Sequence, residues 1–319
     1  MPHPIPAPRT SGTTTTTALP LYWVRYGDHG DPNHGDPHHG DPHHGDPPTR
    51  PTLIILHGGP GADHRYLLPQ LLHLAETYDL LLYDQRGSGQ SRAENNAPIT
   101  WQDHVEDLGK ICHEFGIERP SILGYSWGGM LALLYTIQSA DHPELPTPSR
   151  LVLMSPAPMT KAYRADFDAA MRMRGNTPEI VGERQRLMDS GLRESDPEAY
   201  RQRIFELGVA AYFADPSEAR DLTPFRVVGR VQQSTWESLG DYNLLPAVKQ
   251  AQGRLRIPAL VVHGRQDPIP SQSSVELARA LNTDVIFIDQ CGHVPYVEQP
   301  AKLWAAIDPF LAATDPLTT

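Results

Sequence analysis

Seven short apolar runs constrain the fold of this chain more than any other feature of its sequence. They are rich in Leu, Ile and Val, and segments with helical periodicity separate them. Strands this hydrophobic are typical of a parallel sheet that helices cover on both faces. The sequence therefore predicts an α/β fold with a mainly parallel sheet. The predicted strands are Leu21–Tyr26, Leu53–His57, Leu80–Asp84, Ser121–Tyr125, Leu151–Ser155, Ala259–His263 and Asp284–Asp289.

One helix between these strands has recognisable ends. Thr100 and Asp103 have the spacing of a capping box, and Gly116 can close the C-terminus. The apolar side chains between them fall on one face, which predicts an amphipathic helix packed on the sheet. These side chains are Trp101, Val105, Leu108, Ile111 and Phe115.

The strand pattern disappears between Ala157 and Gln250, where charged, helix-forming segments take over. It resumes at Pro258. We therefore expect residues 157–250 to form a helical cap, inserted into an α/β core of residues 19–156 and 251–319.

One helix of this cap has a clear start. The segment Asp196–Glu198 places Pro197 at a favourable first helical position. The periodicity that follows predicts that Tyr200, Ile204 and Leu207 face inward.

Two segments are expected to lack regular structure. Residues 1–18 are rich in Pro and Thr without periodicity, which predicts a disordered or loosely packed tail. The repeat from His29 to Pro47 holds six histidines and four aspartates, both possible ligands of a transition metal. Every unit also carries Gly and Pro, so we expect a solvated loop within the core and no metal site. It precedes a strand, which places it on the face away from the chemistry.

Composition excludes several classes of protein. The 319 residues carry a formal net charge of −11 and no basic run, which argues against a nucleic-acid partner. No stretch has the roughly 18 continuous apolar residues of a membrane span, and the first residues lack the features of a signal peptide. Cys112 and Cys291 are too few for a disulfide framework. We expect a cytoplasmic protein that does not bind membranes, and the oligomeric state stays open.

The most informative segment for chemistry is Gly124–Gly129, with the sequence GYSWGG. It follows a predicted strand and precedes the helical pattern of Met130–Gln138. A serine at such a sharp strand-to-helix turn is exposed as a nucleophile, and the flanking glycines remove side chains that would collide. The following helix N-terminus and the Trp127 backbone N–H favour negative charge at the same place. Ser126 is the predicted nucleophile.

A second glycine-rich loop, HGGPG at His57–Gly61, directly follows the predicted strand that begins at Leu53. Such a loop lets backbone N–H groups approach a ligand and supplies the other half of an oxyanion hole. We expect Gly59 to donate there together with Trp127.

The expected order of a catalytic triad in such a fold is serine, acid, histidine. Asp267 and His293 follow the strands Ala259–Val262 and Val285–Asp289, so both lie at the carboxyl edge of the sheet with Ser126. His293 can take the serine proton, and Asp267 can orient and stabilise the imidazole.

Other residues compete for these roles. His263 ends a strand but precedes Asp267, His57 lies within the glycine loop, and Asp289 is close to His293 in sequence. Cys291 lacks a nucleophile turn and is expected to be a packed residue. In the loop Asp84–Ser91, an ion pair between Asp84 and Arg86 is the expected structural role.

These motifs together resemble the proline iminopeptidase family of α/β-hydrolases, over residues 20–156 and 252–315. The resemblance implies an eight-stranded sheet with a helical cap, the triad Ser126, Asp267 and His293, and a hole formed by the Gly59 and Trp127 N–H groups. The motifs are HGGPG at His57–Gly61, DQRGSGQS at Asp84–Ser91, GYSWGG at Gly124–Gly129, GRQDP at Gly264–Pro268 and GHVPY at Gly292–Tyr296.

The resemblance is weakest in the cap. Proline iminopeptidases hold the free amino group of the substrate with cap glutamates, one of them in a W-x-x-W-E pattern that this cap lacks. Glu206 and Glu237 are the candidates for this role.

The leading hypothesis is thus a serine hydrolase of the proline iminopeptidase type, which acts on short peptides or other small substrates through an acyl-enzyme and without a cofactor. An esterase, lactonase or small-amide hydrolase with the same triad is the alternative. A non-catalytic binding protein on the same fold is the distant one.

Overall fold

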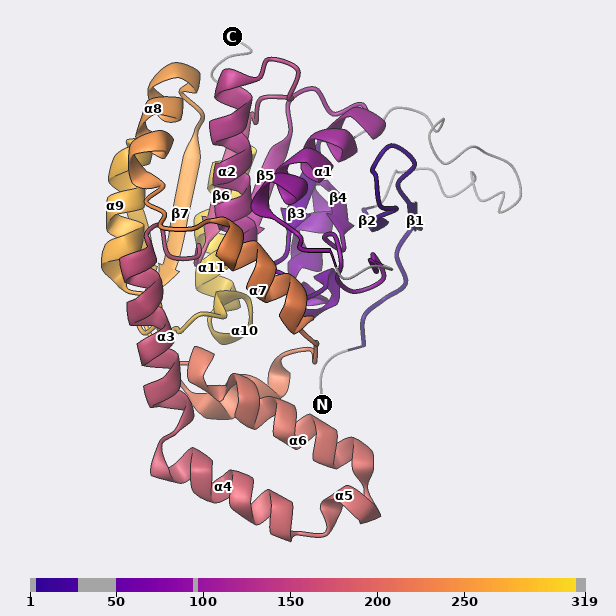
Figure 1. Ribbon diagram of the computed structural model, residues 1–319, viewed down its shortest axis with the longest axis vertical. Helices are drawn as coiled ribbons and strands as arrows, with labels where there is room; N and C mark the ends of the chain where they lie inside the picture. The colour runs from indigo at the N-terminus through magenta and orange to yellow at the C-terminus, as the bar shows by residue number, and fades with distance from the viewer. Residues whose placement is uncertain (1–3, 28–49, 94–96, 314–319) are drawn as a thin grey trace, which may run out of the picture.

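The computed structural model describes residues 4–27, 50–93 and 97–313 of the chain. An eight-stranded sheet forms its centre, with the strand order β1-β2-β4-β3-β5-β6-β7-β8 (Figure 1). The strands are β1 (Thr10–Thr13), β2 (Tyr22–Tyr26), β3 (Thr52–Leu56), β4 (Asp79–Tyr83), β5 (Ser121–Tyr125), β6 (Arg150–Met154), β7 (Ala259–Gly264) and β8 (Val285–Ile288).

The predicted fold class is confirmed. All seven apolar runs form strands, and the strands from β4 to β8 along the sheet pair in parallel, while β1 and β2 are antiparallel additions at one edge. Successive residues of β3 alternate between two apolar cores, with Leu53 and Ile55 on one face and Ile54 and Leu56 on the other. Because helices cover both faces, every position in the middle of the strand must be apolar.

The expectation of a loosely packed tail over residues 1–18 is wrong for part of that segment. Thr10–Thr13 forms β1 and pairs with β2, and the side chain of Thr14 is buried. Backbone pairing with the edge of the sheet orders this stretch although it lacks apolar periodicity. Because the ladder bonds join main-chain groups, hydropathy does not reveal them.

Helices cover both faces of the sheet. On one face α1 packs against α2, and α2 lies against β5, β3 and β6, while α8 packs on both α2 and α9. α11 contacts β7 and β8 from the opposite core. These helices are α1 (Trp101–Glu114), α2 (Trp127–Asp141), α8 (Leu245–Leu255), α9 (Ser271–Leu281), α10 (Pro295–Glu298) and α11 (Pro300–Ala312), with the 3₁₀ helices η1 (His64–Leu67) and η2 (Gln70–Glu76) near the opposite core.

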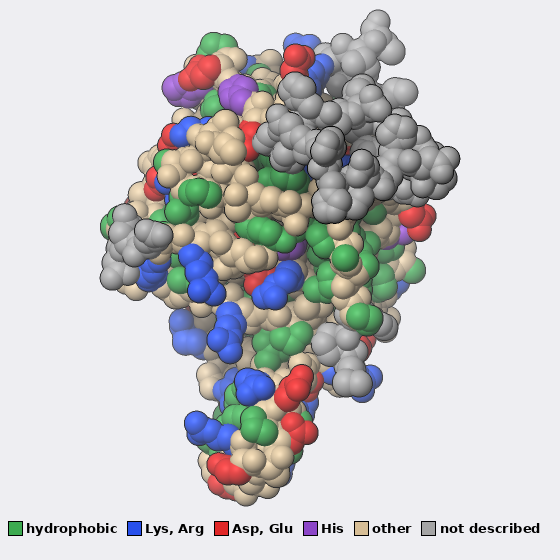
Figure 2. Space-filling model, turned by 90° about the vertical axis from the view of Figure 1, so that its right-hand side faces the viewer, with side chains coloured by type: hydrophobic (Ala, Val, Ile, Leu, Met, Phe, Trp, Pro, Cys, Tyr) green, Lys and Arg blue, Asp and Glu red, His purple; other side chains and the backbone are tan. Residues whose placement is uncertain are grey.

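The chain between β6 and β7 is helical. Its helices α4, α5 and α6 form the narrow lower part of the molecule, away from the sheet, where charged side chains of both signs alternate with hydrophobic ones (Figures 1 and 2). The division into a core and a cap at residues 157 and 250 stays a prediction. The elements are α3 (Lys161–Gly175), α4 (Pro178–Asp189), α5 (Leu192–Ser195), α6 (Pro197–Val209), η3 (Ala210–Tyr212), η4 (Pro216–Asp221), α7 (Gly229–Ser238) and α8.

Helix α6 starts where the sequence predicts, with Asp196 as N-cap. Leu207 is buried, but the inward position predicted for Ile204 is wrong, because that side chain is 38% exposed. Phe205 makes the inward contact instead, edge-on to Phe225 at a ring distance of 5.5 Å. Adjacent side chains of an α-helix point in directions about 100° apart, so Phe205 can face inward while Ile204 faces outward.

Two further expectations concern the histidine-rich repeat and membrane-spanning helices. The His29–Pro47 repeat lies outside the described residues. None of the helices within the described ranges is long and apolar enough to cross a membrane.

The predicted capping box of α1 is confirmed, and it yields a test of stability. Thr100 Oγ1 accepts a hydrogen bond from the Asp103 N–H, and the Asp103 carboxylate accepts one from the Thr100 N–H at 2.7 Å. Thr100→Ala removes the hydrogen bond from the Asp103 N–H to Thr100 Oγ1 and keeps the one from the Thr100 N–H to the Asp103 carboxylate. We expect a loss of about 1 kcal/mol in the free energy of unfolding, measured by urea denaturation. Thr100→Ser retains the hydroxyl and should lose clearly less; equal losses in both variants would show that the hydroxyl does not cap the helix.

Candidate active site

Ser126 lies at the turn between β5 and α2 with an unusual backbone conformation. Its φ of 53° and ψ of −117° are strained for a residue with a side chain. Hydrogen bonds fix the turn on both sides: the Ser126 N–H donates to Met154 O, and Ser126 O accepts from the N–H groups of Gly129, Met130 and Ala157. The predicted strand-turn-helix context of this serine is present.

Glycines allow other chain segments to approach this turn. A Cβ at Gly128 would collide with the backbone oxygens of Leu56 and His57, and one at Gly124 would collide with the Gly128 backbone. A Cβ at Gly58 would lie 2.9 Å from the Cβ of Ser126 itself. The two glycine-rich motifs therefore approach each other closely at the Ser126 turn. Their glycines leave room where a side chain would collide.

Ser126, His293 and Asp267 form a continuous hydrogen-bonded series. Ser126 Oγ lies 3.0 Å from His293 Nε2, and His293 Nδ1 lies 2.8 Å from Asp267 Oδ2. The second oxygen of Asp267 accepts the Ile269 N–H at 2.8 Å. The acid and the histidine come from the loops that follow β7 and β8, as the sequence predicts, and Ser126 keeps part of its surface accessible.

The electrostatics of this series favour an ionised acid. Burial acts to raise the pKa of Asp267, but the adjacent imidazoles of His293 and His263 and the hydrogen bonds from His293 and Ile269 outweigh it, so that its pKa is lowered. A carboxylate at this position keeps the Nδ1 proton on His293. The Nε2 atom is then free to accept the Ser126 proton.

His293 is held by residues that the sequence analysis did not identify. Its backbone N–H donates to Tyr212 O at 2.7 Å, and the Tyr212 ring stacks on the imidazole at a centroid distance of 5.3 Å. The buried carboxylate of Glu298 accepts from the N–H groups of Gly292, Val294 and Ala214. Tyr212 and Ala214 belong to the inserted segment, and no motif near either residue indicates that they contact His293 and Glu298, respectively.

The predicted oxyanion donors flank Ser126. Trp127 is the first residue of α2, so its N–H has no partner within the helix, and Gly59 adopts a φ of 49° in the loop after β3. Within the described ranges, neither N–H donates a hydrogen bond to another protein group. Both groups are therefore free for a ligand oxygen, and their role in catalysis stays a prediction.

The competing residues have other contacts. His263 bonds to Ser274 Oγ and Ile269 O, and its Nδ1 lies 4.0 Å from Asp267 Oδ2, behind the acid. His57 is tied to Gly58 O and to the Gln85 N–H, and burial lowers its pKa. Asp289 forms an exposed ion pair with Arg265. These contacts leave His293 as the imidazole beside Ser126.

Cys291 is fully buried within the loop that carries His293. Burial raises the pKa of its thiol, so the sulfur stays protonated. This environment agrees with a packed residue and not with a nucleophile.

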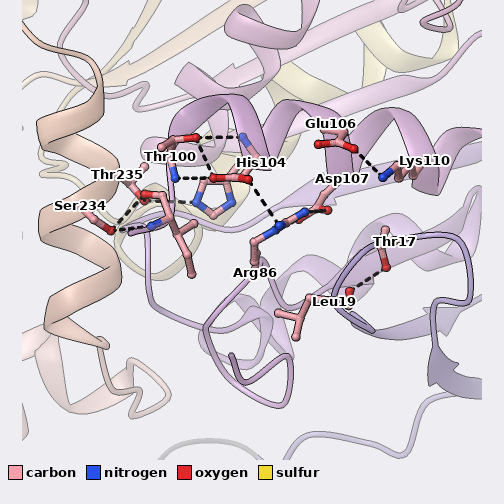
Figure 3. A network of polar contacts seen from close by, with 12 residues as sticks. Thr17, Leu19, Arg86, Thr100, His104, Glu106, Asp107, Lys110, Ser234 and Thr235 are labelled. Carbon is pink, nitrogen blue, oxygen red and sulfur yellow. Dashed lines mark hydrogen bonds and ion pairs between the residues drawn. The ribbon is translucent and has the colours of Figure 1, made fainter. Parts of the chain in front are cut away.

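The ion pair predicted between Asp84 and Arg86 is wrong. Asp84 accepts hydrogen bonds from the His64 imidazole and the Gln90 N–H, whereas Arg86 Nε donates to Asp107 at 2.8 Å (Figure 3). The two side chains therefore reach different elements, Asp84 the helix η1 and Arg86 the helix α1.

Gln85, between them, connects three segments of the site. Its Nε2 donates to His57 O at 2.8 Å, and its Oε1 accepts from Trp127 Nε1 at 2.9 Å. This buried amide thus fixes the glycine loop against Trp127, the residue that follows Ser126. The sequence motif placed Gln85 in the correct loop, but only the tertiary structure shows what it contacts.

The two glutamates predicted to bind substrate lie on different helices, α6 and α7, and each has another partner. Glu206 accepts from Arg203 and Gln202 on its own helix and lines a cavity of about 740 Å³ among the inserted helices. Glu237 is exposed on α7 and accepts from Gln233. Neither Ser126 nor His293 lines that cavity, so it is distinct from the hydrogen-bonded series.

Comparisons with known proteins agree with this architecture. Residues 51–300 match the model of the alpha/beta hydrolase fold family. The chain is 25% identical over 291 residues to a proline iminopeptidase of Lactobacillus delbrueckii subsp. bulgaricus, covering 83% of this chain and 91% of that protein. It is 27% identical over 293 residues to a proline iminopeptidase of Levilactobacillus brevis, covering 83% and 90%.

A solved structure shows the same fold. A proline iminopeptidase-related protein from Thermus thermophilus superimposes with a TM-score of 0.69 at 20% identity, covering 96% of this chain and 98% of that one. The fold and the family match define a hydrolase, and the chain belongs to the alpha/beta hydrolase fold family. Within this family it is similar to the proline iminopeptidases, as the sequence motifs predict.

The position of Gln85 leads to a prediction. Gln85→Ala leaves the buried Trp127 Nε1 and His57 O without partners, at a cost of about 1–3 kcal/mol for an unsatisfied group. We expect a lower urea midpoint for this variant. Gln90→Ala, in the same loop but exposed, is the matched control and should stay within about 0.5 kcal/mol of the wild type. Equal midpoints for both variants would contradict the role of Gln85.

Proposed function

We propose that this hydrolase cleaves small amide or peptide substrates through an acyl-enzyme on Ser126, as a proline iminopeptidase-like aminopeptidase. The observation that carries the proposal is the series from Ser126 Oγ to His293 Nε2 at 3.0 Å and from His293 Nδ1 to Asp267 at 2.8 Å. The order of these residues along the chain and the similarity to proline iminopeptidases support it.

In the proposed mechanism, His293 accepts the proton of Ser126 as the hydroxyl attacks the substrate carbonyl. The resulting oxyanion receives hydrogen bonds from the Gly59 and Trp127 N–H groups. His293 then gives its proton to the leaving amine, and the acyl group stays on Ser126. A water molecule, deprotonated by His293, releases the acid and restores the serine.

The alternative is an esterase, lactonase or small-amide hydrolase with the same triad. One observation favours it: Glu206 is paired with Arg203, and Glu237 is exposed, so neither predicted carboxylate stands beside Ser126 to hold a substrate ammonium. The similarity to peptidases over most of the chain favours the aminopeptidase, and we place it first.

We also propose that the protein is located in the cytoplasm. Cys112 and Cys291 are both free and buried, which suits the reducing cytoplasm.

The triad assignment predicts graded losses of activity. Ser126→Ala should lower kcat by about six orders of magnitude, and Asp267→Asn by about four, because the amide leaves His293 in the wrong tautomer. Steady-state kinetics on the best substrate measure both losses, with circular dichroism to verify the fold. Full activity of Ser126→Ala would refute the assignment.

Substrate hydrolysis separates the two candidate functions. The purified enzyme is assayed with proline p-nitroanilide and with p-nitrophenyl acetate, and the Ser126→Ala protein gives the background for each. The peptidase proposal expects turnover of the anilide. Turnover of the ester alone, lost in Ser126→Ala, would replace the proposal by the esterase.

A further inference from the structure

A polar side chain of the inserted segment lies close to the proposed catalytic residues. On α3, the Phe167 ring lies 6.3 Å from the His293 imidazole and 6.5 Å from the Tyr212 ring. Arg164 lies one turn earlier on the same helix face, and its guanidinium carbon lies 5.8 Å from the centre of the Phe167 ring. The Phe167 ring therefore connects Arg164 to the His293 imidazole.

The same guanidinium stacks on a tryptophan of α7. Its carbon lies 4.0 Å from the Trp236 ring centre, and Trp236 packs edge-on against Trp127, the neighbour of the nucleophile, at 5.3 Å. Arg164 thus contacts two rings, one packed near His293 and the other packed against Trp127. Stacking on Trp236 fixes its plane and leaves the edges of the guanidinium for hydrogen bonds.

Helix α7 holds Trp236 in place. Ser234 Oγ accepts the Ile99 N–H at 3.1 Å, and Thr235 Oγ1 donates to Ile99 O and lies 3.3 Å from His104 Nε2 of α1 (Figure 3). The platform under Arg164 is therefore anchored to the N-terminal end of α1 in the core.

The hydrogen bonds of Arg164 are incomplete. Nε donates to Asp168 Oδ1 at 2.9 Å, and the side chain is 24% exposed. In the described part of the chain, its two terminal nitrogens have no hydrogen-bond partner. When Nε of a guanidinium is already hydrogen-bonded, its two terminal nitrogens can still donate side by side to the two oxygens of one carboxylate.

We propose that Arg164 is a specificity-determining residue whose terminal N–H groups bind the free C-terminal carboxylate of a short peptide. This inference rests on the proposed aminopeptidase function, because a prolyl peptide with an apolar second residue carries its carboxylate only on the leaving-group side. The Phe167 ring connects Arg164 to His293, which would protonate that leaving group. The substrate class is therefore the dipeptide and similarly short unblocked peptides.

The test compares prolyl-alanine with prolyl-alanine amide. For the wild type, kcat/KM should be roughly 10- to 100-fold higher for the free acid, as expected for hydrogen bonds to a charged group. Arg164→Gln should bring this ratio close to one. Arg172→Gln, on an exposed position of the same helix, is the matched control and should keep the wild-type ratio. Equal rates for the two peptides in the wild type, or an unchanged ratio in Arg164→Gln, would overturn the inference while the peptidase proposal stands.

Binding separates this inference from the proposed function. Calorimetry on Ser126→Ala, with and without Arg164→Gln, measures the affinity for both peptides without turnover. If the wild type cleaves neither peptide, the peptidase proposal fails. Tighter binding of the free acid that Arg164→Gln abolishes would still support the carboxylate site, and equal binding of acid and amide would refute it.

Discussion

The backbone of Ser126 is the constraint on which the rest of the site depends. A positive φ at a non-glycine residue costs on the order of 1–3 kcal/mol, and such a conformation persists only where its surroundings determine it. Met154 and Ala157 bond to the main chain of Ser126 from β6 and the turn after it, while Gly129 and Met130 bond to it from α2. The sheet and the helix together hold the hydroxyl at the carboxyl edge of the strands. Glycines at 58, 124 and 128 follow from this placement, since each lies where a Cβ would displace the turn.

His293, the proposed general base, depends on a different set of contacts. The carboxylates of Asp267 and Glu298 accept hydrogen bonds from the loop of His293, whereas Tyr212 O, in the inserted segment, accepts another. Burial raises the pKa of Glu298, and its three N–H donors oppose that effect. The buried carboxylate thus satisfies main-chain groups on either side of the histidine, which would otherwise lie in the interior without partners.

The parts of this molecule that the sequence predicts are those with local causes. Apolar runs identify the strands because both faces of the sheet are covered, and the Thr100 capping box lies within four consecutive residues. The positions of Ser126, Asp267 and His293 follow from the rule that parallel strands end at a common edge. By contrast, β1 depends on main-chain pairing, and the pairing of Arg86 with Asp107 depends on the course of a loop. Tyr212, Gln85 and Arg164 approach the site from distant parts of the chain, so no local pattern reveals them. The cap glutamates were inferred from a resemblance that is weakest in that region, and the structure does not bring them to Ser126.

The hydrogen bond from the His293 N–H to Tyr212 O joins the proposed general base to the inserted segment. Ala214, two residues further on, donates to Glu298, which also binds the N–H groups next to the histidine. A displacement of η3 and the residues that follow it away from the sheet would break both links at once and release the loop of His293. Ser126, the proposed nucleophile, would then lack its aligned proton acceptor, so greater exposure of its hydroxyl to water and loss of its proposed reactivity would occur together.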